Sequence, residues 1–246
     1  WNKFAQVSRL PDFDERKGLS GQQLVHLFAW DEATFLRMTE GGPIRRIGHE
    51  RWLRNIAVAL GNAPSAPEVL AAEIGRRSYR VAVLAFGTNT DPYQPIEHHY
   101  RLTRQLLEVM LAHRHPVGII TKSAMILRDL DLLAELAREG LCQVMVSVTT
   151  LNETLRRQLE PRASTGVGRI KVIERLAKAG VPVGVLAAPM IPRLNEPELE
   201  QIIKAAVDAG AGCADYILLR LPHELTTLFC DWLDTHYPGQ KEAILN

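Results

Sequence analysis

The sequence predicts an α/β fold in which a parallel sheet is covered by helices. After Ser78, short apolar runs alternate with longer amphipathic stretches, and a glycine follows several of those stretches. Near-continuous apolar strands are typical of a parallel sheet that is buried on both faces. The composition agrees, since 46% of the 246 residues are hydrophobic and only 6% are aromatic, which favours this class over an aromatic-rich β-sandwich.

Five strands are predicted, and a helix follows each of them. Gly140, Gly180 and Gly210 stand where three of the helices should end. Five such units suit either an open doubly wound sheet or most of a barrel. The strands are expected at residues 81–86, 117–121, 143–148, 181–188 and 216–221, and the helices at residues 98–112, 130–138, 168–179, 196–209 and 224–235.

The first 64 residues have a different pattern, which predicts only helices. Asp31 is a candidate N-cap for a helix that carries Phe35, and a further helix is expected at residues 45–60. Two prolines and several small residues at 62–67 are typical of a linker. The sequence therefore predicts a helical segment at residues 1–64, a linker at 65–77 and an α/β domain at 78–246.

The charge and the cysteines exclude several classes of protein. The formal net charge is +1, so no global field recruits nucleic acid or a membrane surface. No apolar run reaches the roughly 18 residues that a membrane span needs. Cys142, Cys213 and Cys230 are odd in number and far apart, which argues against a disulfide framework and against a compact cysteine metal motif. We therefore expect a cytoplasmic protein without membrane contact.

Polar residues follow the predicted strands directly. Residues 87–95 read Gly-Thr-Asn-Thr-Asp-Pro-Tyr-Gln-Pro, residues 121–123 read Thr-Lys-Ser, and Ser147 lies at the end of the third strand. In parallel α/β folds, the chemistry lies at the carboxyl ends of the strands. The hydroxyls and amides, together with Lys122 and Arg220, predict a site for a small polar ligand that carries a carboxylate. The alternative is that these loops are polar only because turns require such residues.

Two other patterns give weaker signals. His98 and His99, or His113 and His115, could bind a metal, although a cation at a helix end is favoured without one. A basic cluster within residues 45–54 could contact a nucleic-acid backbone, or it could be the exposed face of a charged helix, and charge alone favours neither interpretation. The arginines of this cluster are Arg45, Arg46, Arg51 and Arg54.

From about residue 78 to residue 238, the chain resembles radical S-adenosylmethionine (SAM) proteins, especially a bacterial group related to spore photoproduct lyase. The motifs occur in the family's order and spacing over about two-thirds of the chain, so the resemblance is specific. The resemblance rests on the motifs at 87–95 and 121–123, Val-Ser-Val-Thr-Thr at 146–150, Leu-Glu-Pro-Arg at 159–162, Ala-Ala-Pro-Met-Ile-Pro at 187–192 and Leu-Arg-Leu-Pro at 219–222.

This resemblance implies a partial (β/α)6 barrel with two cofactors, SAM and a [4Fe–4S] cluster, whose reduction cleaves SAM to a 5′-deoxyadenosyl radical. It implies that residues 87–91 lie near the methionine part of SAM, that Lys122 pairs with the SAM carboxylate, and that Ser147 hydrogen-bonds to SAM. A substrate is not implied, and DNA and tRNA are both candidates. The implied cofactor-binding residues are Gly87, Thr88, Asn89, Thr90, Asp91, Lys122 and Ser147, with no metal ligand among them.

The cysteine pattern departs from that family. The family's C-x3-C-x2-C loop follows its first strand, and both should precede Ser78, where the sequence has neither. We therefore expect a partial radical-SAM-type barrel that lacks its first strand, preceded by a small all-α N-terminal segment. Because none of the three cysteines has the required spacing, we expect this chain by itself to be inactive in SAM cleavage.

The first 64 residues resemble a different family, epoxyqueuosine reductase, a cobalamin and iron–sulfur enzyme of tRNA queuosine modification. The resemblance rests on residues 28–32, 39–46 and 51–62, and it implies that the basic cluster approaches tRNA. The sequence thus predicts pieces of two families joined near residues 64–78. Three functions stay open: a radical SAM protein similar to spore photoproduct lyase, an epoxyqueuosine-reductase-related fragment, and a non-enzymatic α/β scaffold.

Overall fold

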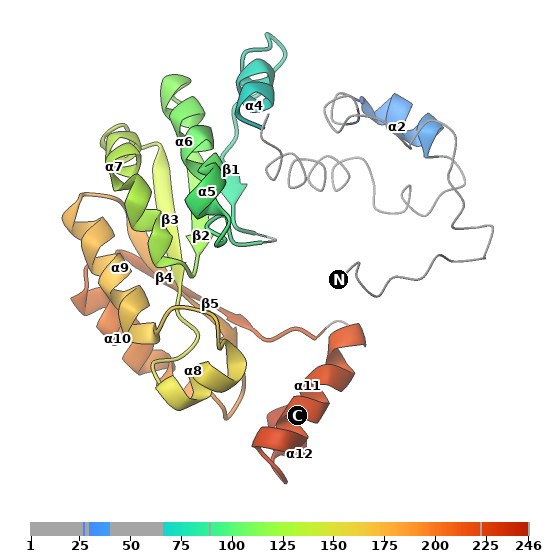
Figure 1. Ribbon diagram of the computed structural model, residues 1–246, viewed down its shortest axis with the longest axis vertical. Coiled ribbons are helices and arrows are strands. Elements are labelled where there is room, and N and C mark those ends of the chain that lie inside the picture. The colour runs from blue at the N-terminus through green and yellow to red at the C-terminus, as the bar shows by residue number, and fades with distance from the viewer. Residues whose placement is uncertain (1–26, 28–29, 40–65, 89, 222, 246) are drawn as a thin grey trace. The chain divides into compact units, whose positions relative to one another are not determined.

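The computed structural model describes residues 27, 30–39, 66–88, 90–221 and 223–245 (Figure 1). The chain divides into two compact units, residues 1–69 and residues 70–246. In the first unit, helix α2 (Glu32–Met38) confirms the helix predicted after Asp31, whose Oδ1 accepts the backbone N–H of Thr34 at 2.8 Å. The helix predicted at 45–60 lies outside the described residues.

Five parallel strands form one sheet in the second unit, in the order β1-β2-β3-β4-β5. Each strand therefore lies next to the strand that precedes it in the sequence, and every crossover advances in the same direction. A doubly wound sheet reverses direction once, whereas a barrel does not. The α/β prediction is confirmed, and the strand order selects the barrel type. The strands are β1 (Leu84–Phe86), β2 (Val117–Thr121), β3 (Cys142–Ser147), β4 (Val183–Met190) and β5 (Cys213–Leu218).

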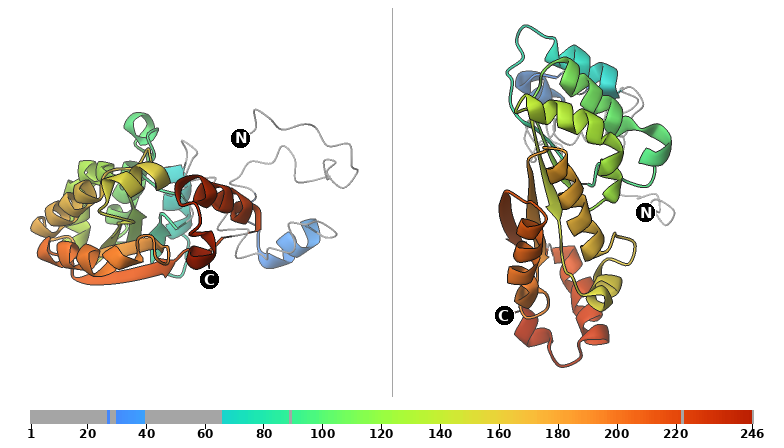
Figure 2. Two further views of the ribbon diagram at one scale, coloured as in Figure 1. Left: turned by 90° about the horizontal axis from the view of Figure 1, so that it is seen from below. Right: turned by 90° about the vertical axis from the view of Figure 1, so that its left-hand side faces the viewer.

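Helices cover one side of this sheet (Figures 1 and 2). Helix α6 packs on α7, helices α7 and α9 pack on β3, and α9 and α10 pack on β4. No helix among the described residues is long and apolar enough to cross a membrane. The helices are α4 (Ala66–Ile74), α5 (Glu97–Tyr100), α6 (Leu102–Ala112), the 3-10 helix η4 (Ala124–Asp129), α7 (Leu130–Arg138), α8 (Glu153–Leu159), α9 (Gly166–Lys178), the 3-10 helix η5 (Glu196–Glu198), α10 (Leu199–Asp208), α11 (His223–His236) and α12 (Lys241–Leu245).

The main core lies between the sheet and this helical layer. Alternate residues of β2 and β3, such as Ile119 and Val144, are almost fully buried. Leu133 and Leu136 of α7 belong to the same cluster, since their spacing places both on one helix face. The opposite face of β3 is more open, because Gln143 is exposed.

The single helix predicted at 98–112 is wrong, because the structure has two helices there. Arg101 separates α5 from α6 with a φ of 50°, a left-handed conformation that ends one helix. The Glu97 side chain then caps the next helix, since its Oε1 accepts the backbone N–H groups of Leu102 at 2.9 Å and Thr103 at 3.1 Å. A local carboxylate that satisfies these donors makes the break possible.

Other element boundaries also differ from the predictions. Strand β5 begins three residues earlier than expected and β4 two residues later, because the apolar runs extend into the neighbouring loops. Helix α8 was not predicted. Its signal is Asn152, which caps the helix by accepting the N–H groups of Thr154 and Leu155, followed by Leu155 and Leu159 at helical spacing.

Candidate functional site

The motifs that follow β1, β2 and β3 meet at the carboxyl edge of the sheet. Thr121 pairs with Val146 in the parallel register of β2 and β3. Lys122 and Ser147, the next residue of each chain segment, therefore lie at adjacent strand ends. The sequence predicted a ligand site from these residues separately, and the register brings them together.

Gly87 lets the chain leave β1 close to the backbone of β2. Its φ is 91°, which L side chains rarely adopt, and a Cβ atom built on it would lie 1.9 Å from the carbonyl oxygen of Ile120. Thr88 and Thr90 then expose their side chains to solvent. Asn89, the remaining predicted residue in this turn, lies outside the described residues. The turn thus carries two exposed threonines next to the end of β1.

Asp91 fixes this loop to β2. Its Oδ1 accepts the N–H of Tyr93 at 2.9 Å and the hydroxyl of Thr121 at 2.8 Å, while Oδ2 accepts the backbone N–H of Lys122 at 2.8 Å. Tyr93 is buried, and its ring lies 5.9 Å from the guanidinium of Arg128. Both oxygens of Asp91 therefore serve the protein itself, so this residue shapes the site through the backbone of Lys122.

Ser147 presents a hydroxyl on the open face of the sheet. Side chains alternate along a strand, so Ser147 shares a face with Gln143 and Met145, opposite the buried Val146. The residue is only 4% exposed. Within the described part of the chain, its hydroxyl makes no hydrogen bond. A nearly buried hydroxyl without a protein partner at a strand end is suited to a hydrogen bond with a ligand.

Lys122 forms an ion pair with Glu160, which lies in the loop between α8 and α9. The lysine side chain stays 34% exposed. Burial raises the pKa of the Glu160 carboxyl, but the charges and hydrogen bonds of Arg169 and Lys122 outweigh burial and hold that pKa below its usual value. The site therefore contains a paired lysine whose side chain is partly exposed to solvent.

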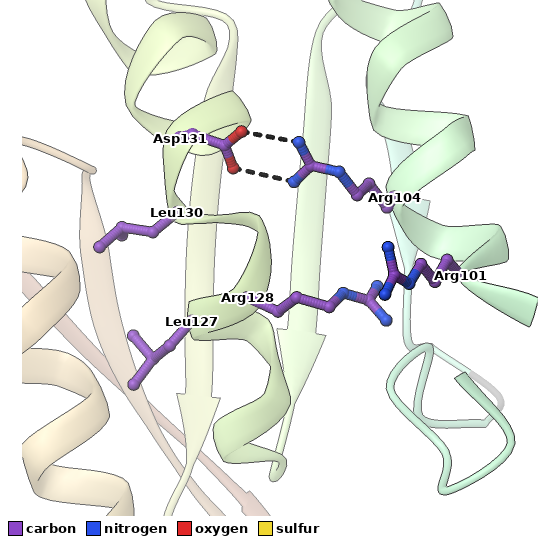
Figure 3. Close-up of a pocket in the computed structure, with 6 residues that line it drawn as sticks. All are labelled: Arg101, Arg104, Leu127, Arg128, Leu130 and Asp131. Carbon is purple, nitrogen blue, oxygen red and sulfur yellow. Dashed lines mark hydrogen bonds and ion pairs between the residues drawn. The ribbon is translucent and has the colours of Figure 1, made fainter. Parts of the chain in front are cut away.

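A second polar cluster lies on the helical side of the sheet and was missed by sequence reasoning. It lines an open hollow of about 490 Å³ that contains Arg101, Arg104 and Arg128 (Figure 3). Arg104 is bound to Asp131 at 2.7 Å and to the buried Asp129 at 3.3 Å, and Arg128 also pairs with Asp129 at 2.8 Å. Arg128 also forms an ion pair with Glu97 of α5 at 3.0 Å. These paired charges fasten η4 and α7 to α5 and α6, and they are a structural network.

The predicted histidine metal sites are not supported by the described geometry. His115 is buried, and its Nε2 lies 2.8 Å from the hydroxyl of Tyr79, while Nδ1 of His113 lies 2.9 Å from the carbonyl oxygen of Val109. Among the described residues, no group of three or more His, Cys, Asp or Glu side chains could hold a metal ion. The predicted nucleic-acid contacts Arg45, Arg46, Arg51 and Arg54 lie outside that part of the chain.

The three cysteines lie on different elements of the fold. Cys142 is buried at the start of β3, where its thiol donates to the carbonyl oxygen of Leu133 at 3.3 Å and burial raises its pKa to about 11. Cys213 is exposed on β5, and Cys230 is half-buried on α11. A thiol with a raised pKa is a poor metal ligand at neutral pH. These cysteines do not fit the ligand set of a [4Fe–4S] cluster.

Comparison with known proteins identifies the family. Residues 64–206, more than half of the chain, match the Radical SAM superfamily. The chain therefore belongs to the radical SAM superfamily, whose members use SAM and a [4Fe–4S] cluster. The fold is similar to that of spore photoproduct lyase. One mutant of that enzyme aligns with a TM-score of 0.54 at 16% identity, over 72% of this chain and 52% of that one. Another, with bound AdoMet and dinucleoside spore photoproduct, aligns with a TM-score of 0.53 at 16% identity, over 71% and 50%.

Sequence relatives fall into two groups. The epoxyqueuosine reductase of Alicycliphilus denitrificans is 86% identical over 63 residues, which are 26% of this chain and 18% of that protein. The Escherichia coli enzyme is 54% identical over 77 residues, or 31% and 20%. An uncharacterized protein of Mycobacterium tuberculosis is 33% identical over 172 residues, or 69% and 51%. The chain thus spans about a fifth of the reductases it matches and about half of the mycobacterial relative.

Proposed function

We propose that this chain binds SAM at the carboxyl ends of β1, β2 and β3, as part of a radical SAM protein similar to spore photoproduct lyase. The observation that carries the proposal is that Lys122 and Ser147 lie at adjacent strand ends, with a Ser147 hydroxyl that has no hydrogen-bond partner within the described part of the chain. The ammonium of a partly exposed lysine suits the carboxylate of an amino-acid group, and a hydroxyl suits its neighbouring polar atoms. The solved spore photoproduct lyase mutant that contains AdoMet has the same fold.

In this proposal, each motif has a separate task. Lys122 binds the carboxylate, and Ser147 donates a hydrogen bond to the same ligand. The turn of Gly87, Thr88, Asn89 and Thr90 covers the methionine part, while Asp91 holds the turn against β2. SAM bound to a reduced [4Fe–4S] cluster would supply the 5′-deoxyadenosyl radical. Because the three cysteines do not fit that cluster, we propose that this chain by itself does not cleave SAM.

The test is calorimetric titration of the protein with SAM. We expect Lys122→Met to weaken binding by about 10- to 100-fold, because a charge-assisted hydrogen bond contributes about 1.5–3 kcal/mol. Lys178→Met is the matched control, since Lys178 also pairs with a glutamate but is 73% exposed on α9. Absence of SAM binding by the unchanged protein, or equal binding by the Lys122 variant, would overturn the proposal.

Anaerobic reconstitution with iron and sulfide tests the second part of this proposal. The expected result is no stable cluster absorbance and no 5′-deoxyadenosine from SAM. Formation of 5′-deoxyadenosine by this chain alone would show that its cysteines do assemble a working cluster.

A separate function is favoured for residues 1–64 by the 86% identity to an epoxyqueuosine reductase. We propose that this segment contacts tRNA through Arg45, Arg46, Arg51 and Arg54. Phosphate contacts weaken as salt rises, so tRNA affinity should fall steeply with salt, and replacement of all four arginines by glutamine should reduce that slope. An affinity that does not respond to salt would contradict this assignment.

A further inference from the structure

A buried arginine joins the end of β3 to Glu160. Arg169 lies in the first turn of α9, and its side chain is only 2% exposed. Its Nη1 donates to the carbonyl oxygen of Ser147 at 3.1 Å, and its Nη2 donates to Oε2 of Glu160 at 2.7 Å. Its Nε donates to the carbonyl oxygen of Ser164 at 3.1 Å. All three nitrogen groups of Arg169 are therefore used inside the protein.

Glu160 uses its two carboxylate oxygens for two different cations. Oε2 accepts from Arg169, and Oε1 accepts from the ammonium of Lys122. One anion between two cations leaves this cluster with a net charge of +1. Since Arg169 is buried and each of its three nitrogens donates to the protein, the surplus positive charge can reach a ligand only through the partly exposed Lys122.

The loop that carries Glu160 is itself fixed. The backbone N–H of Glu160 donates to the carbonyl oxygen of Arg156 at 2.7 Å, which closes the end of α8. The Arg156 side chain is 11% exposed, and its Nη1 donates to the carbonyl oxygens of Glu160 and Ala163, each at 3.0 Å. The carboxylate that holds Lys122 therefore comes from a backbone that is held in place by its own hydrogen bonds.

We propose that Glu160 is a positioning residue, which directs the ammonium of Lys122 toward the carboxylate of bound SAM, and that Arg169 holds Glu160 in place. This inference rests on the SAM site proposed above. A lysine ammonium has three donors, and Glu160 is the partner of one of them, so the others can serve a ligand. A side chain that is already ordered loses less conformational freedom on binding. Repulsion between the two carboxylates is reduced by the ammonium that lies between them and by solvent.

The test compares SAM with decarboxylated SAM, which lacks the group that Lys122 would bind. We expect Glu160→Gln to weaken SAM binding about tenfold and to leave the affinity for decarboxylated SAM within about twofold, because only the carboxylate contact depends on Lys122. In a Lys122→Met background, Glu160→Gln should have no further effect on SAM binding. Glu174→Gln is the matched control, since Glu174 pairs with the exposed Lys178.

Each outcome decides between the two proposals. A Glu160→Gln variant that binds SAM as tightly as the unchanged protein, or more tightly, overturns the positioning role while the SAM site stands. Equal weakening for both ligands shows a purely structural role and also overturns it. An unchanged protein that binds no SAM overturns both proposals. If Glu160→Gln fails to fold because Arg169 loses its partner, the Glu160→Gln/Arg169→Met double variant, which removes both charges of this ion pair, is measured instead.

Discussion

At the scale of single residues, the motif that follows β1 divides into residues that hold the loop and residues that face outward. The family resemblance implies that Asp91 lies near SAM, and in the structure its oxygens accept hydrogen bonds from Tyr93, Thr121 and Lys122. Thr88 and Thr90 expose their side chains instead. A motif shows which residues occur together in the sequence. Only their contacts in the folded chain show which of them hold the loop in place.

Gly87 provides a prediction at this scale. Gly87→Ala should lower the free energy of unfolding by more than about 2 kcal/mol, because an alanine is strained at positive φ and its Cβ would meet the backbone of Ile120. Gly140→Ala is the control, since Gly140 has a φ of 69° but no atom within 4 Å of a built Cβ, and it should cost about 1 kcal/mol. Urea unfolding followed by circular dichroism measures both variants. Equal losses would show that the close approach to β2 has no energetic effect.

At the scale of elements, the helices of the α/β unit were found from sequence where an apolar stripe and a terminal glycine coincide. Helix α7 matches its predicted bounds because Leu133 and Leu136 mark its buried face and Gly140 follows it. The break at Arg101 was not found, because the apolar stripe that predicts this helix begins at Leu102 and does not show where the helix starts. That break depends on Glu97, whose capping contact is a feature of the folded chain.

The contact between α6 and α7 makes stability depend on pH. Hydrogen bonds from Arg104 lower the pKa of Asp131 from the ordinary 3.8 to about 2. A carboxyl whose pKa is lower in the folded state than in the unfolded state stabilises the protein at pH values above its unfolded-state pKa. That contribution is lost as the pH falls through the folded-state pKa. Asp131→Asn should therefore reduce stability at pH 7 by about 0.2–1 kcal/mol, the range for an exposed pair, and the difference should vanish as the pH falls from 3.8 toward 2.

Denaturant unfolding as a function of pH measures this effect. Asp208→Asn is the matched control, because Asp208 also pairs with one cation, Lys204, and is 65% exposed. At pH 7, Asp208→Asn should lower the free energy of unfolding by less than Asp131→Asn does. A difference at pH 7 that persists below pH 2 would mean that the Asp131 substitution acts through packing rather than through charge.

At the scale of the whole molecule, the sheet of the α/β unit ends in an unprotected strand. All six residues of β5 are exposed, including Tyr216 at 56% and Leu218 at 55%. A parallel sheet is ordinarily covered on both faces, and an exposed apolar edge strand can pair with other chains. The apolar runs predicted a parallel sheet covered by helices, but β5 lies last in the sheet, where its burial depends on a neighbour.

We therefore expect β5 to promote self-association. Lysine substitutions at Tyr216 and Leu218 should raise the protein concentration at which light scattering begins, by about severalfold, because charge on an edge strand opposes strand pairing. Val167→Lys is the control, since Val167 is 58% exposed but lies on helix α9. An equal gain from the control would show that added charge alone improves solubility and that the edge has no special role.

The sequence by itself determined the alternation of strands and helices, the parallel character of the sheet and the residues at its carboxyl edge. These follow from local patterns, since apolar periodicity and terminal glycines act within one element. The tertiary structure alone decided the strand order, the break at Arg101 and the joining of Lys122 to Glu160 and Arg169. Those features depend on specific contacts, some of them between residues as far apart as Lys122 and Glu160, which are separated by 38 positions, and short-range periodicity does not encode such contacts.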